Sequence, residues 1–140
     1  VAGLGTGGTL MGVGRSLKEY KSNIKIIAAE PHPDEVVPAL RSIEHGFIPP
    51  ILNLDELDNR ILVGNEESFY WTKQLLCKCG IFAGISSGAV VAAARKISVK
   101  MDSGKVVLLI ADSGEKYVSS GLWTKEYSEI KKNIDKKIWW

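Results

Sequence analysis

A glycine-rich turn near the beginning of the chain has the composition of a phosphate-binding site. The run Gly3-Leu4-Gly5-Thr6-Gly7-Gly8-Thr9 follows a short apolar segment and precedes a helical pattern. Backbone N–H groups in the first turn of a helix have no partner within the helix, and the helix dipole favours an anion there. Glycines let the backbone approach a phosphate closely, and the hydroxyls of Thr6 and Thr9 can donate to it. The run therefore predicts a phosphate site.

The same turn also fits a second kind of site, the pyrophosphate loop of a nicotinamide-dinucleotide-binding domain. Gly3, Gly5 and Gly8 have the spacing of that loop, and Glu30 ends the next apolar segment where a ribose-binding acid is expected. The continuation His32-Pro33 is unusual for a ribose contact. If Glu30 does hold a ribose, charge reversal there is expected to abolish dinucleotide binding and to affect a phosphate at the glycine turn little.

Two serine-containing segments lie where an expected strand passes into an expected helix or turn. Ile85-Ser86-Ser87-Gly88-Ala89 reads as a helix cap with a small residue for close packing. Ala111-Asp112-Ser113-Gly114 follows an apolar run directly, so the Ser113 hydroxyl is expected at a strand end. Either segment alone is also explained by ordinary capping.

Short apolar segments alternate with longer helical patterns along the chain. This alternation predicts an α/β domain of three layers, Rossmann-like, with a mainly parallel sheet covered on both faces. Ligands of such sheets bind at the carboxyl ends of the strands. Strands are expected at residues 1–4, 25–30, 60–63 and 106–111, and helices at 10–20, 66–79, after Ser86 or Ser87, and around Tyr127, Ile130 and Ile134.

Three expectations concern individual elements. The run Val106–Ala111 is the clearest candidate for a buried strand, because it is continuously apolar. Leu10, Val13 and Leu17 share one face of the first helix and are expected to be buried. Residues 34–59 are the least regular stretch, in which residues 36–43 could form a short helix, and a loop of this length is often functional.

Composition excludes several classes of protein. The 18 basic and 16 acidic residues leave a net charge of +2, which gives no electrostatic case for nucleic acid or an anionic membrane. No apolar run approaches the roughly 18 residues of a membrane span. Cys77 and Cys79 point to different sides of a helix and have no partner ligands for zinc. We expect reduced thiols in a cytoplasmic protein, with Cys79 buried, and no metal.

Taken together, the motifs resemble those of cysteine synthase and its relatives. That family includes the O-acetylserine and O-phosphoserine sulfhydrylases and cystathionine beta-synthase. The resemblance rests on the glycine-rich turn, Ala29-Glu30-Pro31, the serine segment at 85–89, and the run from Ala111 to Tyr117. It extends from Val1 to about Trp123, so residues 1–123 are expected to be the C-terminal cofactor-binding part of such an enzyme and residues 124–140 a helix and tail.

The resemblance implies a tryptophan synthase beta-like fold and a pyridoxal phosphate cofactor. Gly5, Thr6, Gly7, Gly8 and Thr9 would bind the cofactor phosphate, and Ser113 would lie beside the pyridine nitrogen as a neutral partner. The implied activity is synthesis of L-cysteine from O-acetylserine or O-phosphoserine and a sulfur donor by beta-replacement. A homodimer is expected.

The family's Schiff-base lysine has no counterpart here and would lie upstream of Val1, so no catalytic residue is assigned and the chain alone is expected to be inactive. Gly46 and Phe47 would line the substrate channel, and Ile138, Trp139 and Trp140 would gate the site. A phosphate leaving group would need a nearby cation, for which Lys73 and Lys116 are candidates. A non-catalytic binding module remains an alternative.

Overall fold

The computed structural model describes residues 1–134 of the chain, and the expected gate at Ile138, Trp139 and Trp140 lies outside them. Three strands, four α-helices and three 3₁₀ helices follow one another within the described part. In chain order they are β1 (Ala2–Gly3), α1 (Gly8–Tyr20), β2 (Ile27–Pro31), η1 (Ile43–His45), η2 (Leu54–Glu56), β3 (Asn59–Val63), α2 (Asn65–Cys79), α3 (Ile85–Ser98), η3 (Gly114–Ser120) and α4 (Tyr127–Ile134).

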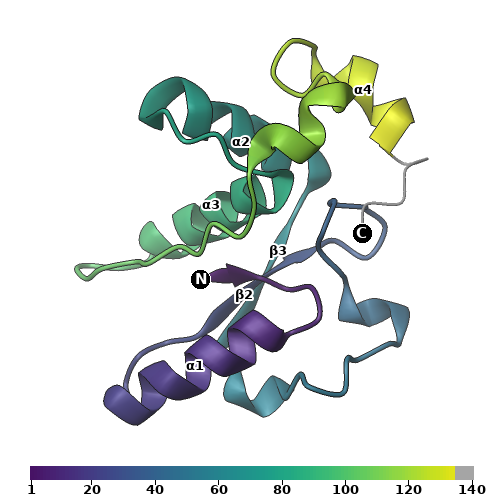
Figure 1. Ribbon diagram of the computed structural model, residues 1–140. Helices are drawn as coiled ribbons and strands as arrows, with labels where there is room; N and C mark the ends of the chain where they lie inside the picture. Colours follow the sequence, from purple (N-terminus) through teal and green to yellow (C-terminus); the bar gives the residue numbers. More distant parts are fainter. Residues whose placement is uncertain (135–140) are drawn as a thin grey trace.

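The strands form a parallel sheet in the order β1-β2-β3, as predicted. Helix α1 lies on one side of this sheet and α2 and α3 lie on the other, which gives the three expected layers (Figure 1). All three strands end at the same edge, where β1 passes into the glycine-rich turn and β3 into α2. This arrangement brings segments far apart in sequence to one edge of the sheet.

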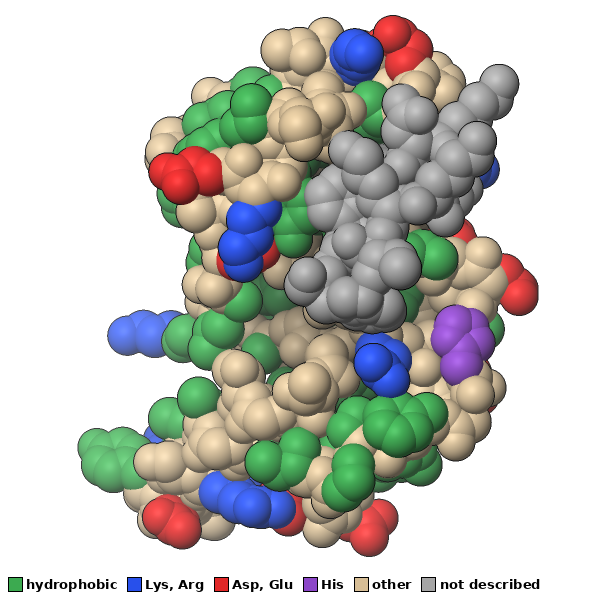
Figure 2. All heavy atoms as spheres, turned by 45° about the vertical axis from the view of Figure 1, so that its right-hand side comes forward, with side chains coloured by type: hydrophobic (Ala, Val, Ile, Leu, Met, Phe, Trp, Pro, Cys, Tyr) green, Lys and Arg blue, Asp and Glu red, His purple; other side chains and the backbone are tan. Residues whose placement is uncertain are grey.

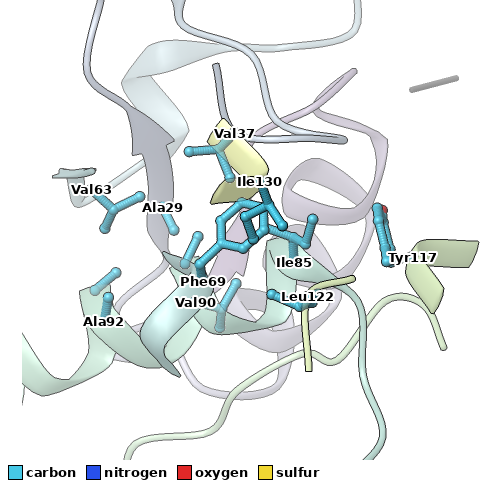
Figure 3. Packing of buried hydrophobic residues seen from close by; sticks show 12 residues of the cluster. Ala29, Val37, Val63, Phe69, Ile85, Val90, Ala92, Tyr117, Leu122 and Ile130 are labelled. Carbon is cyan, nitrogen blue, oxygen red and sulfur yellow. The ribbon is translucent and has the colours of Figure 1, made fainter. Parts of the chain in front are cut away.

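Each face of the sheet has its own apolar core. On the side of α3, Phe69 and Ile130 are almost fully buried, together with residues of the strands and of α3 (Figure 3). On the side of α1, Leu10 and Met11 pack with Leu4 and Leu52. The last helix joins the first of these cores through Tyr127 and Ile130, which confirms the predicted inward face of that helix as far as its side chains are described.

The expectation of a buried strand at Val106–Ala111 is wrong. The segment lies beside β1: the amino group of Val1 donates to the carbonyl of Val107 at 2.9 Å, and the N–H of Leu109 donates to the carbonyl of Val1 at 3.1 Å. Yet Val107 is 78% exposed. A strand is fully buried only when other elements cover both of its faces. Among the described residues, segment 106–111 is not a regular strand and lies at the edge of the sheet beside β1.

Other expectations fail because close contacts override the sequence pattern. Helix α1 buries Leu10, Met11 and Gly14, since Gly14 lets the helix approach Ile26, and it leaves Val13 and Leu17 exposed. The short helix expected at residues 36–43 does not form: Pro38 is followed by Ala39 with φ of 67°, and the 3₁₀ helix η1 begins only at Ile43. Cys79 is exposed, as is Cys77, and both thiols are free.

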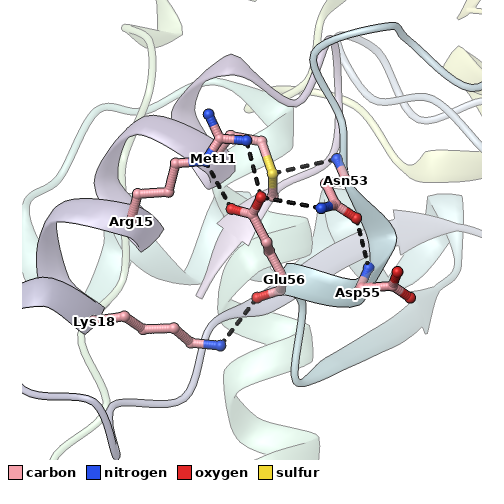
Figure 4. A network of polar contacts seen from close by, with 6 residues as sticks. All are labelled: Met11, Arg15, Lys18, Asn53, Asp55 and Glu56. Carbon is pink, nitrogen blue, oxygen red and sulfur yellow. Dashed lines mark hydrogen bonds and ion pairs between the residues drawn. The ribbon is translucent and has the colours of Figure 1, made fainter.

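A polar network fastens the irregular segment 53–58 to α1. The Arg15 guanidinium binds the Glu56 carboxylate at 2.7 and 2.9 Å, and the N–H of Asn53 donates to the sulfur of Met11 at 3.3 Å (Figure 4). Nearby, Asp58 accepts from the N–H of Ile26 at 2.8 Å and pairs with Lys18 at 2.9 Å. These contacts hold the chain between η2 and β3 against the sheet.

The Asp58 carboxylate gives the fold a defined acid sensitivity. Burial alone would raise its pKa, but hydrogen bonds from Ile26, Lys18 and Lys25 lower the pKa to about 2. Because the pKa is depressed on folding, the stabilisation is present above about pH 4 and is lost as the pH falls through 2. We expect Asp58→Asn to cost about 1 kcal/mol at pH 7 after allowance for solvent screening.

Urea unfolding of wild type and Asp58→Asn at pH 7 and at pH 2.5 tests this expectation. The difference between the two proteins should shrink at the lower pH. A difference independent of pH would show that the charge of Asp58 contributes nothing.

Candidate functional site

The glycine-rich turn leaves the N-terminus of α1 open to an anion. Gly7 is the N-cap, with φ of 87° in the left-handed region, and no side chain caps the helix. The first turn of α1 contains no acidic residue. Thr6 and Thr9 are exposed, so their hydroxyls are accessible. The free N–H groups and the helix dipole therefore meet at a helix start that carries no carboxylate of its own.

Two irregular segments pack against this turn. A Cβ atom on Gly7 would lie 2.9 Å from Cβ of Leu52, and one on Gly5 would lie 3.3 Å from the carbonyl oxygen of Ala39. The N–H of Arg41 donates to the carbonyl of Leu4 at 2.7 Å. Glycine is thus required at position 7, both by its positive φ and by the contact with Leu52, and a side chain at position 5 would be crowded by the backbone of Ala39.

Arg41 is a cation beside the turn that the sequence analysis missed. Its guanidinium stacks over the ring of Phe47, with 5.0 Å from Cζ to the ring centroid, and Phe47 is itself exposed. The residue lies in the irregular stretch 34–59, where no periodicity marks a functional position. Of the cations named from sequence, Lys73 binds the carbonyl of Lys125 and Lys116 pairs with Asp112.

Ser113 lies at the same edge of the sheet as the glycine-rich turn. The two hydrogen bonds of Val1 with Val107 and Leu109 are those of a parallel bridge, with Leu108 opposite Val1. Continuing this register to the end of β1 sets Gly3 level with Ile110, three residues before Ser113. The Ser113 hydroxyl is exposed, and within residues 1–134 its one hydrogen bond is a long one, 3.4 Å, accepted from the N–H of Glu115. Its proton can therefore be donated to a ligand.

The serine segment at the start of α3 does not cap the helix as predicted. Gly84 is the N-cap, and Ser86 and Ser87 lie within the first turn. The Ser86 hydroxyl reaches the Asp112 carboxylate at 3.4 Å. The Ser87 hydroxyl is buried with no hydrogen-bond partner among the described residues.

Glu30 is not available to a ribose, because its carboxylate is fully buried and occupied. It accepts hydrogen bonds from the Ser42 hydroxyl at 3.1 Å, from the N–H of Ile43 at 2.9 Å and from the Arg60 guanidinium at 3.0 Å. The expectation that charge reversal at Glu30 would separate the two kinds of phosphate site is wrong, since reversal would disrupt the fold itself.

The described residues contain no other candidate ligand site as clearly formed as the glycine-rich turn. Residues 1–134 hold no group of three or more His, Cys, Asp or Glu side chains that could bind a metal, and none of their helices has the length and apolarity to cross a membrane. On the face seen in Figure 2, acidic and basic side chains are intermixed. Hollows beside α1 and at the start of α2 do not include the glycine-rich turn or Ser113.

Comparison with known families shows which family the chain belongs to. Residues 1–112 match the family described as pyridoxal-phosphate dependent enzyme. The chain belongs to this family of pyridoxal-phosphate dependent enzymes. The cofactor inferred from the resemblance is thereby confirmed at the level of the family.

Relatives in this pyridoxal-phosphate dependent family include cysteine synthases. That of Aquifex aeolicus (strain VF5) is 41% identical over 129 residues, which cover 89% of this chain and 39% of that protein. That of Staphylococcus aureus (strain Mu50 / ATCC 700699) is 39% identical over 132 residues, which cover 89% of this chain and 43% of that protein. The chain thus spans about two fifths of the length of these relatives.

Solved structures of this family confirm the predicted tryptophan synthase beta-like fold, of which the chain contains part. An O-acetyl serine sulfhydrylase, isoform 3, from Entamoeba histolytica superposes with a TM-score of 0.80 at 26% identity, over 96% of this chain and 43% of that one. A hydrogen sulfide-producing enzyme from Fusobacterium nucleatum superposes with a TM-score of 0.78 at 34% identity, over 89% of this chain and 40% of that one.

The residues present fit pyridoxal phosphate. An uncapped helix N-terminus lined by glycines suits its phosphate, and an exposed hydroxyl with a weak partner suits its ring nitrogen. Both leave one edge of the sheet. A dinucleotide would need an acid at the end of β2, and Glu30 is occupied there.

Proposed function

We propose that this chain is the cofactor-binding part of a cysteine synthase, which makes L-cysteine from an activated serine and a sulfur donor. The observation that carries the proposal is the open N-terminus of α1 at the edge of the sheet from which Ser113 also projects. The similarity to cysteine synthases at about 40% identity supports it. Homodimerisation and a cytoplasmic location belong to the same proposal.

Each part of the site has a separate role. The amides and hydroxyls of residues 5–9 hold the cofactor phosphate against the positive end of α1. Ser113 donates its hydroxyl proton toward the ring nitrogen and, being uncharged, does not keep that nitrogen protonated as a carboxylate would. Pyridoxal phosphate, when bound, supplies the electron sink that allows a group on the beta carbon of the substrate to leave.

The remaining roles need residues outside these 140. No lysine of this chain has the expected sequence context of the Schiff-base lysine, so we assign that residue to the larger part of the enzyme and expect the chain alone to be inactive. Gly46 and Phe47 are assigned to the substrate side, because residues 39–41 of the same segment lie against the glycine-rich turn. We assign Arg41 as the cation for a phosphate leaving group, because its backbone binds Leu4 beside the glycine-rich turn and its guanidinium lies over Phe47.

Placing a negative charge at the start of α1 tests the phosphate site without harming the fold. In Gly8→Asp the carboxylate occupies the end of the helix dipole that would attract the phosphate. We expect the affinity for pyridoxal phosphate and for inorganic phosphate to fall at least tenfold, while the melting temperature stays the same or rises. The matched control is Gly12→Asp, one turn later, where a side chain would meet nothing within 4 Å.

Binding is measured by titration calorimetry on the folded chain with pyridoxal phosphate, inorganic phosphate and NADH in parallel. Equal loss in the Gly8 and Gly12 variants would place the anion elsewhere. Tight binding of NADH with none of pyridoxal phosphate would favour the nicotinamide alternative, and binding of none of the three would favour a non-catalytic module.

A further inference from the structure

Asp112 lies at the centre of contacts that join three segments around Ser113. Its carboxylate accepts from the Tyr117 hydroxyl at 3.0 Å and from the Ser86 hydroxyl at 3.4 Å, and it faces the Lys116 ammonium at 3.7 Å. Its backbone carbonyl accepts from the N–H of Gly84 at 2.9 Å. One residue thus connects the start of α3, the turn at 112–114 and η3.

Asp112 packs so closely against Gly84 that no side chain would fit at position 84. A Cβ atom on Gly84 would lie 2.1 Å from Oδ1 of Asp112 and 2.6 Å from its Cγ. The carboxylate is therefore set directly against the N-terminus of α3. That helix has no side-chain cap and no acidic residue in its own first turn, so Asp112 supplies the negative charge that the helix dipole favours.

The backbone on both sides of Ser113 is held by residues directly before the start of α3. The N–H of Gly114 donates to the carbonyl of Phe82 at 3.1 Å, and Ala83 and Ser113 form an antiparallel bridge. The Tyr117 hydroxyl is kept protonated, because burial and then the charge of Asp112 raise its pKa. Tyr117 thus remains a donor to Asp112. In contrast, the one hydrogen bond of the Ser113 hydroxyl in the described part of the chain is the 3.4 Å contact with Glu115.

From this geometry we propose that Asp112 is a positioning residue, which fixes the Ser113 hydroxyl at the cofactor ring nitrogen through the backbone of the turn at 112–114. The proposal rests on the proposed function for the identity of the ligand. It assigns Asp112 no contact with the cofactor. The charge of Asp112 acts on α3 and Tyr117, and Ser113 follows because it is the next residue in the chain.

The first test needs no ligand. In Asp112→Asn, amide hydrogen exchange of the Gly84 and Gly114 N–H groups should become at least fivefold faster, because the charged carboxylate that holds both segments is replaced by a neutral amide. The N–H of Leu4, bonded to the carbonyl of Ala29 at 2.8 Å in the sheet, is the internal control and should not change. Lys116→Gln removes a partner whose side chain is 69% exposed and should leave all three amides unchanged.

The second test asks whether Asp112 acts through Ser113. Pyridoxal phosphate and inorganic phosphate are titrated into wild type, Asp112→Asn, Ser113→Ala and the double variant. We expect each single variant to bind pyridoxal phosphate three- to tenfold more weakly, the double variant to be no weaker than Ser113→Ala, and inorganic phosphate to bind all four equally.

The outcomes separate the two proposals. Additive losses in the double variant, or unchanged exchange at Gly84 and Gly114, would overturn the role of Asp112. Equal losses for inorganic phosphate would also overturn it, because the effect would then be a general loss of structure. If wild type binds phosphate but not pyridoxal phosphate, the proposed function fails, and the exchange measurement alone decides whether Asp112 holds the turn.

Discussion

Replacing Gly88 with alanine is expected to destabilise the protein by about 3 kcal/mol or more, although it adds one methyl group. Gly88 faces α2 where the two helices touch. A Cβ atom there would lie 2.0 Å from the carbonyl oxygen of Ser68 and 2.2 Å from Oγ1 of Thr72. The Ser68 oxygen belongs to the backbone of α2, and the Thr72 hydroxyl is fixed because it donates to that oxygen. Neither atom can move aside unless the two helices separate.

The measurement is urea unfolding of Gly88→Ala beside Gly12→Ala. Gly12 is also in a helix, but a Cβ atom there meets nothing within 4 Å. Its replacement should stabilise the protein by up to about 1 kcal/mol, through helix propensity alone. If both variants change stability by the same amount, helix propensity and not the contact between α2 and α3 governs position 88. Since a domain of this size is stable by about 5–15 kcal/mol, the expected loss is a large fraction.

Elements whose structure depends on local chemistry could be predicted from the sequence. The parallel strands, the helix after the glycine-rich turn and the end of α2 at Gly80 follow from turn residues, apolar runs and helix caps. Gly80 adopts φ of 68°, the left-handed conformation expected of a residue that ends a helix. The edge of the sheet that carries the candidate site follows from the same topology.

Features that depend on contacts between segments far apart in the chain could not be predicted from the sequence. Val106–Ala111 reads as buried because it is continuously apolar, but burial depends on neighbours on both sides. Arg41 belongs to no motif, and Asp112 stands out in the sequence only as the neighbour of Ser113. Their positions are set by backbone contacts with Leu4 and Gly84 across the fold, which no local spacing reports. The same holds for Glu30, whose position fits a ribose acid and whose partners make it a structural anchor.

Glu30→Gln is expected to cost about 2–3 kcal/mol of stability, because it replaces a fully buried carboxylate with a neutral amide beside the Arg60 guanidinium. Loss of the charge leaves Arg60 without its buried partner, and the hydrogen bonds to Ser42 and Ile43 weaken with it. Segment 39–47, which borders the glycine-rich turn, is released in consequence. Affinity for inorganic phosphate should therefore fall modestly, by about two- to threefold.

Glu44→Gln is the matched control for this variant. Glu44 also faces Arg60, at 3.6 Å, but its side chain is 54% exposed, so its loss should change stability by less than about 0.5 kcal/mol. Chemical unfolding measures both variants, and calorimetric titration with phosphate and NADH measures the site. A Glu30→Gln protein of unchanged stability that had lost affinity for NADH alone would contradict the structural role of this carboxylate. It would restore the ribose-binding interpretation, because an acid that binds a ribose can be neutralised without cost to the fold.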